Sequence, residues 1–566
     1  MCNRVPYPPL FVFCIAIIFI INIILYQYND ETSSTPKLFT SRYSSRTVPS
    51  QVALQKSTPP GDMGLPVQFN QSDPRVAAEL KRSLVQQGLN EHASDLVSVR
   101  RRLPDLRDPW CRDTKTNRLS SESLPATSIV IVFHNEVWSV LVRTVHSVLD
   151  RSPARLIKEI ILVDDCSNLP FLKTQLEEYF DAYPVVRFIR SKERLGLIRA
   201  RMVGAKNASS DIVTFLDAHV ECMEGWLEPL LEVVVRNSTH IALPTIDRIN
   251  ERDMSLRTNI SLLLAGAFEW DLNFGWCERK QLHRKYAHPY EPFDTPAMAG
   301  GLFTINRTFF ERIGWYDEHY ILYGMENIEL SIKSWMCGGK LLTVPCSRVG
   351  HVQKHSHPYL FTVKKDLAFH NSARLAEVWM DEYKQVVFDV NGYPRYSEAL
   401  FGSVEARKRV RERAKCKPFR HYLKRAFPEL HKPSIQGQFR GDVRNLVLGV
   451  GSCLTVDKKG TAPYMAPCNG LQTTQYWSHS YYQDINSYKA CLDFNGSTLT
   501  TTICHRHRGN QSWMYVSETK QIVSIPHNRC LAISEHSNFT LTLAKCDATK
   551  EKQSWSVNLV TYSFVN

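Results

Sequence analysis

Three short apolar segments of this chain each run directly into polar residues, and this pattern most constrains the fold. They are residues 128–136 (SIVIVFHNE), 159–165 (EIILVDD) and 211–219 (DIVTFLDAH). Continuous β-branched runs of this length are typical of parallel strands that are buried on both faces. Residues 137–150 and 197–208 have helical spacing, so the sequence predicts repeated strand–helix–strand units in an open α/β sheet.

The polar tails of these segments are candidates for a ligand site, because ligands bind beyond the carboxyl ends of the strands in such sheets. Asp217 and His219 could offer a carboxylate and an imidazole to one divalent cation, and His351 is a third candidate ligand. The alternative for Asp217 is a solvated carboxylate at a strand end. The other two tails, FHNE and DD, favour the metal site, because they place further polar groups at the same edge.

The chain has no Gly-x-Gly-x-x-Gly motif and no Walker-type loop, which argues against a Rossmann dinucleotide site and a P-loop kinase. A nucleotide bound without such a loop needs another way to neutralise its phosphates. A metal on Asp217 and His219 would do this, leaving Asp165 for uracil or ribose and Arg194 for neighbouring polar contacts.

The N-terminal region differs from the rest of the chain. Residues 10–26 form an apolar run just long enough to span a thin bilayer, with a basic residue before it and two acids after it, which favours a cytoplasmic N-terminus. A cleaved signal peptide is the alternative, although no small-x-small cleavage site follows. Residues 27–89 are predicted to form a flexible lumenal stem, on a composition rich in Ser, Thr, Pro and Gln up to residue 68.

The net charge of +13 does not require a nucleic-acid partner, because the basic residues are spread along the chain. We interpret the surplus as a diffuse field that attracts anionic substrates.

The last third of the chain contains a threefold repeat. Gln-x-Trp recurs at residues 475–477, 511–513 and 553–555, each after a Cys-Leu pair. One such unit cannot bury its apolar face alone, so three units predict one folded domain. Its six cysteines predict three local disulfides, which are Cys453–Cys468, Cys491–Cys504 and Cys530–Cys546.

Eight Asn-x-Ser/Thr sequons agree with a secretory route. Asn510 stands apart from the other sequons, because it directly precedes Gln511 of the second Gln-x-Trp unit. The remaining N-glycosylation candidates are Asn70, Asn207, Asn237, Asn259, Asn306, Asn495 and Asn538.

From about residue 90 to the C-terminus, the chain resembles the polypeptide N-acetylgalactosaminyltransferases. The motifs that carry the resemblance are FHNE, EIILVDD, RLGLIRAR (194–201), FLDAHVE (215–221), MAGGLF (298–303), YGMEN (323–327), PCSRVGHV (345–352), AEVWMDEY (376–383) and the Gln-x-Trp units.

The resemblance implies a single-pass type II Golgi membrane protein with lumenal domains. The expected catalytic domain has the GT-A fold, which is Rossmann-like and typical of nucleotide-diphospho-sugar transferases, and an all-β ricin-type β-trefoil lectin domain follows it. The expected segments are a cytoplasmic tail at 1–9, the membrane anchor at 10–26, the stem at 27–89, the catalytic domain at 90–420, a linker at 421–437 and the lectin domain at 438–562.

The family transfers N-acetylgalactosamine from UDP-GalNAc to Ser or Thr hydroxyls of proteins, with retention at the anomeric carbon and a requirement for Mn²⁺. By motif matching, the resemblance implies that Asp217, His219 and His351 ligate the metal and that Glu326 and Tyr323 form the catalytic end. The other implied donor contacts are Asp165, Arg194, Ala218, Gly301, Lys354 and Tyr359. The implied catalytic-domain disulfides are Cys111–Cys346 and Cys337–Cys416.

The chain departs from the family pattern at the sugar end of the expected site. The family usually has Trp-Gly-Gly-Glu-Asn where this chain has Tyr323-Gly324-Met325-Glu326-Asn327, and Lys354 stands where Arg is common. These differences leave an alternative open. The chain could be a weak or inactive member of the family that acts as a glycopeptide-binding, lectin-like protein.

Only the middle repeat of the expected lectin domain carries the full set of sugar-binding residues, which are Asp493, His505 and Asn510. The first repeat has Thr455 in place of the Asp and the third has Ala532. The resemblance therefore implies one GalNAc site, which would direct the chain to glycopeptide acceptors. Because a glycan on Asn510 would block this site, Asn510 is expected to stay unmodified.

Overall fold

The computed structural model describes residues 59–559 apart from short gaps, which are 71, 114–118, 120, 259–262, 280–285, 356–365, 392–395, 431–436, 450, 457–462, 469–473, 488–489, 506 and 535–539. The predicted membrane anchor at residues 10–26 lies outside the described residues. No helix in the described part of the chain is long and apolar enough to cross a membrane.

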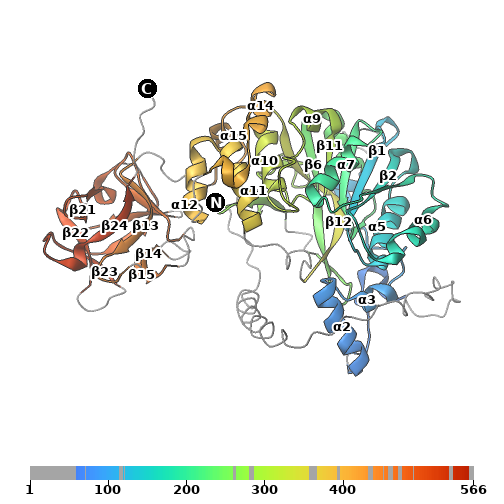
Figure 1. Ribbon diagram of the computed structural model, residues 1–566, viewed down its shortest axis with the longest axis horizontal. Helices are drawn as coiled ribbons and strands as arrows, with labels where there is room; N and C mark the ends of the chain where they lie inside the picture. Colours follow the sequence, from blue (N-terminus) through green and yellow to red (C-terminus); the bar gives the residue numbers. More distant parts are fainter. Residues whose placement is uncertain are drawn as a thin grey trace.

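A ten-stranded mixed sheet forms the centre of the first domain, in the order β10-β12-β6-β11-β4-β1-β2-β3 with β5 and β7 paired at its side (Figure 1). Its strands are β1 (Thr127–Phe133), β2 (Ile157–Asp164), β3 (Val186–Arg190), β4 (Ile212–Asp217), β5 (Val220–Cys222), β6 (His240–Asn250), β7 (Leu256–Arg257), β10 (Phe293–Asp294), β11 (Phe303–Asn306) and β12 (Lys340–Gln353). The separate hairpin beside it consists of β8 (Leu264–Phe268) and β9 (Phe274–Glu278).

The parallel half of the sheet confirms the predicted strand–helix–strand units. β1 lies between β2 and β4 and is parallel to both, and β2 is also parallel to β3. β11 runs antiparallel between β4 and β6, so a mixed region joins the parallel half to β12. The carboxyl ends of β1, β2 and β4 therefore meet at one edge.

Both faces of the sheet are covered, because successive side chains of a strand point to opposite faces. Along β1, Val130 belongs to one apolar cluster, whereas Ile129 and Ile131 belong to the other. The helices that cover these faces and flank the domain are α2 (Pro74–Gln86), α3 (Glu91–Leu96), α4 (Pro109–Arg112), α5 (Trp138–Arg151), α6 (Thr174–Phe180), α7 (Leu197–Lys206), α8 (Glu228–Arg236), α9 (Arg307–Arg312), α10 (Glu326–Met336), α11 (Asp366–Trp379), α12 (Lys384–Asn391), α13 (Glu398–Phe401), α14 (Glu405–Arg413) and α15 (Phe419–Arg425).

The N-terminal boundary of the folded part lies earlier than the sequence predicts. Val67 and Leu89 are buried in a small apolar cluster together with Val140 of α5 and Ile249 of β6. These contacts correct the prediction of a flexible stem up to residue 89. The chain therefore packs on the domain at Val67 and again at Leu89, where these two side chains are buried.

Five disulfides join pairs of cysteines within the described residues, and these five match the predicted pairs. Cys111–Cys346 joins α4 to β12, and Cys337–Cys416 joins the end of α10 to the segment after α14. The three local pairs of the last domain are Cys453–Cys468, Cys491–Cys504 and Cys530–Cys546.

The last domain is a β-rich unit with an internal threefold repeat, as predicted. The indoles of Trp477, Trp513 and Trp555 are completely buried, and their N–H groups donate to equivalent carbonyl oxygens at 2.8, 2.9 and 2.9 Å. Its strands are β13 (Phe439–Asn445), β14 (Ser452–Val456), β15 (Pro463–Pro467), β16 (Trp477–His479), β17 (Ile485–Ser487), β18 (Ala490–Phe494), β19 (Leu499–Thr502), β20 (Trp513–Val516), β21 (Gln521–Ser524), β22 (Arg529–Ile533), β23 (Leu541–Lys545) and β24 (Trp555–Leu559).

The two domains meet at α12. Asp389 of this helix accepts a hydrogen bond from Arg440 of the last domain at 2.8 Å, and the Tyr476 ring packs into the first domain's core.

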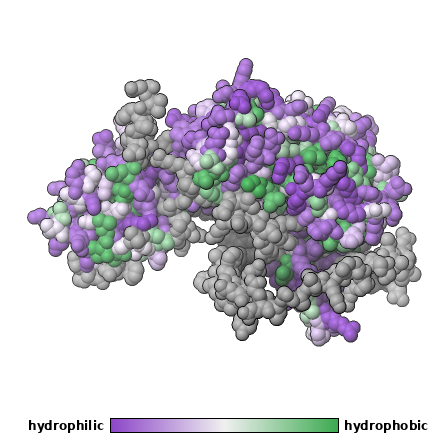
Figure 2. Space-filling model, viewed as in Figure 1, coloured by the Kyte–Doolittle hydropathy of each residue, from purple (hydrophilic) through white to green (hydrophobic). Residues whose placement is uncertain are grey.

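The surface of the molecule is mostly polar in the view of Figure 2. Hydrophilic residues cover most of the coloured surface of both domains, and hydrophobic residues form small patches between them. The large apolar side chains therefore lie mainly in the interior.

Candidate active site

A cavity of about 550 Å³ opens at the carboxyl edge of the parallel strands. Its lining includes the residues that follow β1, β2 and β4, among them His134, Asp165 and Ala218. The predicted convergence of the three polar tails is therefore confirmed. The other predicted residues that line the cavity are Arg194, Asp217, His219, Gly301, Tyr323, Glu326, His351 and Lys354. Tyr359 lies outside the described residues.

Asp217, His219 and His351 form a cluster with suitable geometry for a metal ion. One ligand atom from each lies within 4.8 Å of the others, and His351 Nε2 is 3.2 Å from Asp217 Oδ2. Antiparallel pairing of β5 with β12 produces this cluster, since it places His351 opposite Val220. One carboxylate and two imidazoles at this spacing match the mixed O and N ligands that first-row divalent cations accept.

Glu136 orients one of these ligands from behind. Its Oε2 accepts a hydrogen bond from Nδ1 of His219 at 3.0 Å, which leaves Nε2 of His219 available to a metal. Burial and the nearby Lys354 charge lower the pKa of His219 to about 4, so the imidazole is neutral at pH 7, as a ligand must be.

Lys354 is engaged by the same glutamate. Its Nζ donates to both carboxylate oxygens of Glu136, at 2.8 and 2.9 Å, and only 2% of its side chain is exposed. Burial opposes ionisation of Glu136, but the Lys354 charge and the bond to His219 outweigh it and lower the pKa of Glu136 to about 2. Lys354, which is predicted to contact the diphosphate, thus lies in the cavity wall as part of a buried ion pair.

Arg201 was not predicted as a site residue, although it ends the RLGLIRAR motif. It is buried on α7, and its Nη2 donates to Oδ1 of Asp217 at 2.9 Å. Its Nη1 lies 3.5 Å from Oε1 of Glu326 and makes no hydrogen bond within the described part of the chain. Arg201 therefore links the metal cluster to the carboxylate at the other end of the cavity.

Glu326 and Tyr323 form that other end. Glu326 is the first residue of α10, and its buried carboxylate accepts a hydrogen bond from the Gly324 N–H at 2.9 Å. Burial raises the pKa of Glu326, and the Arg201 charge offsets this only in part. Tyr323 is 52% exposed on the preceding loop. The arrangement can present a carboxylate and a phenol to a polar ligand.

Gly301 lies between the two ends. A Cβ at this position would overlap Oδ2 of Asp217, so the close approach of this backbone to the metal cluster requires glycine. After the roles that the resemblance implies, we call the half of the cavity around Asp217, His219 and His351 the metal end, and the half around Tyr323 and Glu326 the sugar end.

Asp165 and Arg194 lie together beside the cavity as an ion pair. The completely buried Asp165 carboxylate also accepts from the backbone N–H groups of Leu195 and Gly196, at 2.6 and 2.9 Å. It therefore fixes the start of α7 in addition to lining the cavity.

The middle repeat of the last domain differs from the first in the hydrogen bonds at its predicted sugar-binding position. Oδ2 of Asp493 accepts hydrogen bonds from Thr502 and Gln511, at 2.9 and 3.0 Å. Asn510 and His505 are exposed nearby on the same repeat. At the position of Asp493, the first repeat has buried Thr455, whose hydroxyl bonds to the Cys453 carbonyl.

Comparison with known families agrees with this architecture. Residues 128–314 match Glycosyl transferase family 2, residues 280–358 match the N-terminal domain of galactosyltransferase, and residues 439–555 match the ricin-type beta-trefoil lectin domain. These matches cover both of the folded domains and confirm the predicted combination of a GT-A-like α/β domain with a lectin-type domain.

Comparison with individual proteins covers most of the chain. It is 43% identical over 510 residues to a putative polypeptide N-acetylgalactosaminyltransferase 9 of Drosophila melanogaster, covering 88% of this chain and 76% of the relative. It is 39% identical over 465 residues to the Homo sapiens polypeptide N-acetylgalactosaminyltransferase 6, covering 80% and 74%. A crystal structure of GalNAc-T7 with UDP, GalNAc and Mn²⁺ superimposes with a TM-score of 0.63 at 31% identity, covering 88% of this chain and 92% of the other. The chain therefore belongs to the polypeptide N-acetylgalactosaminyltransferase family.

Proposed function

We propose that the chain transfers N-acetylgalactosamine from UDP-GalNAc to Ser or Thr hydroxyls of proteins, with retention at the anomeric carbon and with Mn²⁺ bound at the metal end. The observation that carries this proposal is one cavity that joins the three-residue metal cluster to the buried Glu326 carboxylate through Arg201. The relatives named above and the GalNAc-T7 complex support the choice of sugar and metal.

At the metal end, Asp217, His219 and His351 hold the ion in this proposal. When bound, Mn²⁺ neutralises charge on the diphosphate and on the UDP that leaves. Arg201 keeps Oδ1 of Asp217 occupied, so Oδ2 is the oxygen that faces His351. Lys354 lies beside the cluster as the counter-charge of Glu136, the acid that orients His219.

Asp165, Arg194 and Ala218 contact the uridine in this proposal, and Tyr359 with Lys354 contacts the diphosphate side. Gly301 allows the donor to approach the backbone closely. At the sugar end, Glu326 accepts hydrogen bonds from the sugar hydroxyls and orients them, and the ring of Tyr323 forms the wall.

The lectin-type domain gives the enzyme a second way to select acceptors. We propose that Asp493, His505 and Asn510 bind GalNAc on acceptors that already carry this sugar. We assign the site to the middle repeat because the other two repeats have Thr455 and Ala532 at the position of Asp493. Neither of these side chains offers a carboxylate.

The proposed location is the Golgi membrane, with both domains in the lumen. The apolar run at residues 10–26, the sequons and the five disulfides support it. Of the proposed N-glycosylation sites, Asn70, Asn207, Asn237 and Asn495 are exposed, Asn306 is half-buried, and Asn259 and Asn538 lie outside the described residues.

A second candidate function is glycopeptide binding without efficient transfer. The observation that favours it is the backbone of Met325, which adopts a left-handed conformation at φ 72° where the family usually has glycine. Such strain next to Glu326 could impair the sugar end while leaving the metal end and the lectin repeat intact.

The deciding experiment uses the full-length chain in detergent with Mn²⁺ and UDP-GalNAc. Transfer is measured on naked peptides and on peptides that already carry GalNAc, and UDP binding is measured in parallel. We expect transfer to both classes, with Asp493→Ala reducing only the preference for GalNAc-bearing peptides. Tight UDP binding without transfer to any peptide would instead support the second candidate function.

A further inference from the structure

The loop between α9 and α10 carries Tyr323 and leads into Glu326, and its backbone is unusual. Leu322 and Met325 are both left-handed, at φ 51° and 72°, and Gly324 between them has φ 102°. L-residues rarely adopt this conformation, and it persists only when surrounding contacts impose it. Something outside the loop must therefore hold it.

Asn371 of α11 makes these contacts. Nδ2 of its completely buried amide lies 3.1, 3.3 and 3.0 Å from the carbonyl oxygens of Ile321, Tyr323 and Gly324, so its two N–H groups are shared among three acceptors. Its Oδ1 accepts from the Ile321 N–H at 2.9 Å. One side chain thus satisfies four backbone groups within four residues of the loop.

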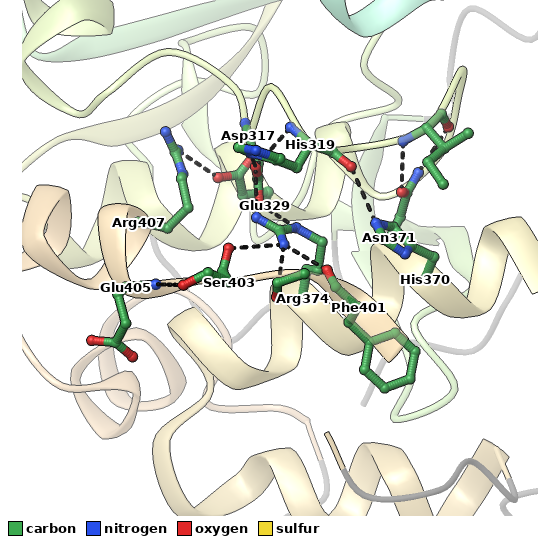
Figure 3. A network of polar contacts seen from close by, with 12 residues as sticks. Asp317, His319, Glu329, His370, Asn371, Arg374, Phe401, Ser403, Glu405 and Arg407 are labelled. Atoms are coloured by element: carbon green, nitrogen blue, oxygen red, sulfur yellow. Dashed lines mark hydrogen bonds and ion pairs between the residues drawn. The ribbon is translucent and has the colours of Figure 1, made fainter. Parts of the chain in front are cut away.

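The helix that bears Asn371 is itself fixed. One turn further along α11, Arg374 pairs with both oxygens of Asp317, at 2.9 and 3.1 Å, and donates to the Phe401 carbonyl at 2.7 Å. His370 lies 3.1 Å from the His319 carbonyl. Figure 3 shows these side chains converging between α11 and the loop. The loop is therefore attached to α11 at Asp317 and His319 as well as at Asn371.

The opposite side of the loop contacts the start of α7, next to Asp165. A Cβ at Gly196 would lie 2.7 Å from the carbonyl oxygen of Leu322, so these two backbones are in close contact. Gly196 also donates its N–H to Asp165. The loop is consequently held between Asn371 on one side and the start of α7 on the other.

We propose that Asn371 is a positioning residue that sets the conformation of Tyr323, Gly324 and Met325 and thereby places the sugar end for the donor. This inference rests on the proposed function, since it assigns the sugar to that end. Asn371 is not part of the cavity lining, and it bonds to neither the metal cluster nor Asp165. Its loss should therefore weaken recognition of the sugar while leaving recognition of UDP unchanged.

The test uses the full-length chain with Asn371→Ala, and with Asn371→Ser as a milder variant that keeps one donor. Asn391→Ala is the matched control, because Asn391 of α12 also donates its amide to a backbone carbonyl, that of Val387 at 2.8 Å, but does not contact the loop. Three quantities are measured: the Mn²⁺-dependent Kd for UDP, the KM for UDP-GalNAc, and the rate at which chymotrypsin cleaves after the exposed Tyr323.

We expect both Asn371 variants to keep the wild-type Kd for UDP within about twofold, and Asn371→Ala to raise the KM for UDP-GalNAc about tenfold, as expected when several hydrogen bonds to one loop are lost. Cleavage after Tyr323 should accelerate, whereas Asn391→Ala should change none of the three quantities. Unchanged KM and cleavage in both Asn371 variants would overturn the proposal. An equal loss of UDP and UDP-GalNAc affinity would also overturn it, since that pattern indicates general damage to the fold.

The cleavage rate separates this proposal from the proposed function. If the wild-type chain transfers no sugar, the proposed function fails, but faster cleavage in the Asn371 variants would still support the positioning role.

Discussion

The metal end and the sugar end of the cavity are built differently. The proposed metal ligands Asp217 and His351 lie on strands of one sheet, where backbone pairing and buried ion pairs fix them. Tyr323 lies on a loop with left-handed backbone residues. Side chains of α11, a helix that is distant in the sequence, hold that loop. Sites on strands are held more precisely than sites on loops. Changes in the loop that carries Tyr323 should therefore alter the transfer of the sugar while leaving UDP affinity unchanged.

The largest expected effect comes from Glu326→Gln. The amide keeps the shape but loses the charge that orients the sugar, so transfer should fall about 100- to 1000-fold, the range for loss of one charge-stabilising group. Single-turnover transfer reports on the sugar end, and UDP affinity reports on the metal end. Glu382→Gln, in an exposed ion pair with Arg420, is the control. Unchanged transfer in Glu326→Gln would remove this residue from the sugar end.

Gly301→Ala should damage the metal end from a position between the two ends. The added Cβ overlaps Oδ2 of Asp217, so this ligand must move, and Mn²⁺-dependent UDP affinity should fall about 100-fold. Gly451→Ala is a matched control, because a Cβ there has no neighbour within 4 Å. Equal UDP affinity in the two variants would show that Asp217 does not bind the metal in the position described.

Glu136→Gln should have a smaller effect on the same end. The substitution removes the charge that orients His219 and leaves Lys354 buried without its counter-charge. Mn²⁺ affinity, measured by titration in the absence of donor, should fall about 10- to 100-fold. Saturating Mn²⁺ should restore the donor KM. A donor KM that stays altered at saturation would show that Glu136 also acts on the sugar end.

The smallest expected effect tests the strain at Met325. Because this residue is left-handed, Met325→Gly should be more stable than Met325→Ala by about 1 kcal/mol, the reverse of the usual order in a helix. Urea unfolding of the two variants gives the difference in the free energy of unfolding. If the alanine variant is equally stable, then the backbone at this position carries no cost, and the sugar end is less strained than the comparison requires.

The sequence was sufficient to predict the parts of the molecule that repeat a local pattern. The strand at residues 186–190 coincides with β3, and the three Gln-x-Trp units form the core of the last domain. The metal cluster was also predicted, because Asp217 and His219 follow a recognisable strand. His351 was a third candidate from the sequence itself, and the family resemblance then assigned it to the metal.

The contacts that could not be predicted join residues far apart in the sequence. Arg201 of α7 and Glu326 of α10 come within 3.5 Å of each other only in the folded chain, and the partners of Asn371 are backbone groups about fifty residues away. Backbone groups leave no sequence signal, since every residue carries them. Burial of Val67 likewise depends on α5 and β6, so composition alone extended the predicted stem too far.

The central claim is that UDP is bound at the metal end and the sugar is positioned at the sugar end. The most direct measurement is Mn²⁺-dependent UDP affinity in Asp217→Ala and Glu326→Gln, by titration calorimetry on the full-length chain. We predict that Asp217→Ala weakens UDP binding by at least about 100-fold and that Glu326→Gln changes it less than about twofold. Equal effects of the two substitutions on UDP affinity would contradict the division of the cavity into two ends.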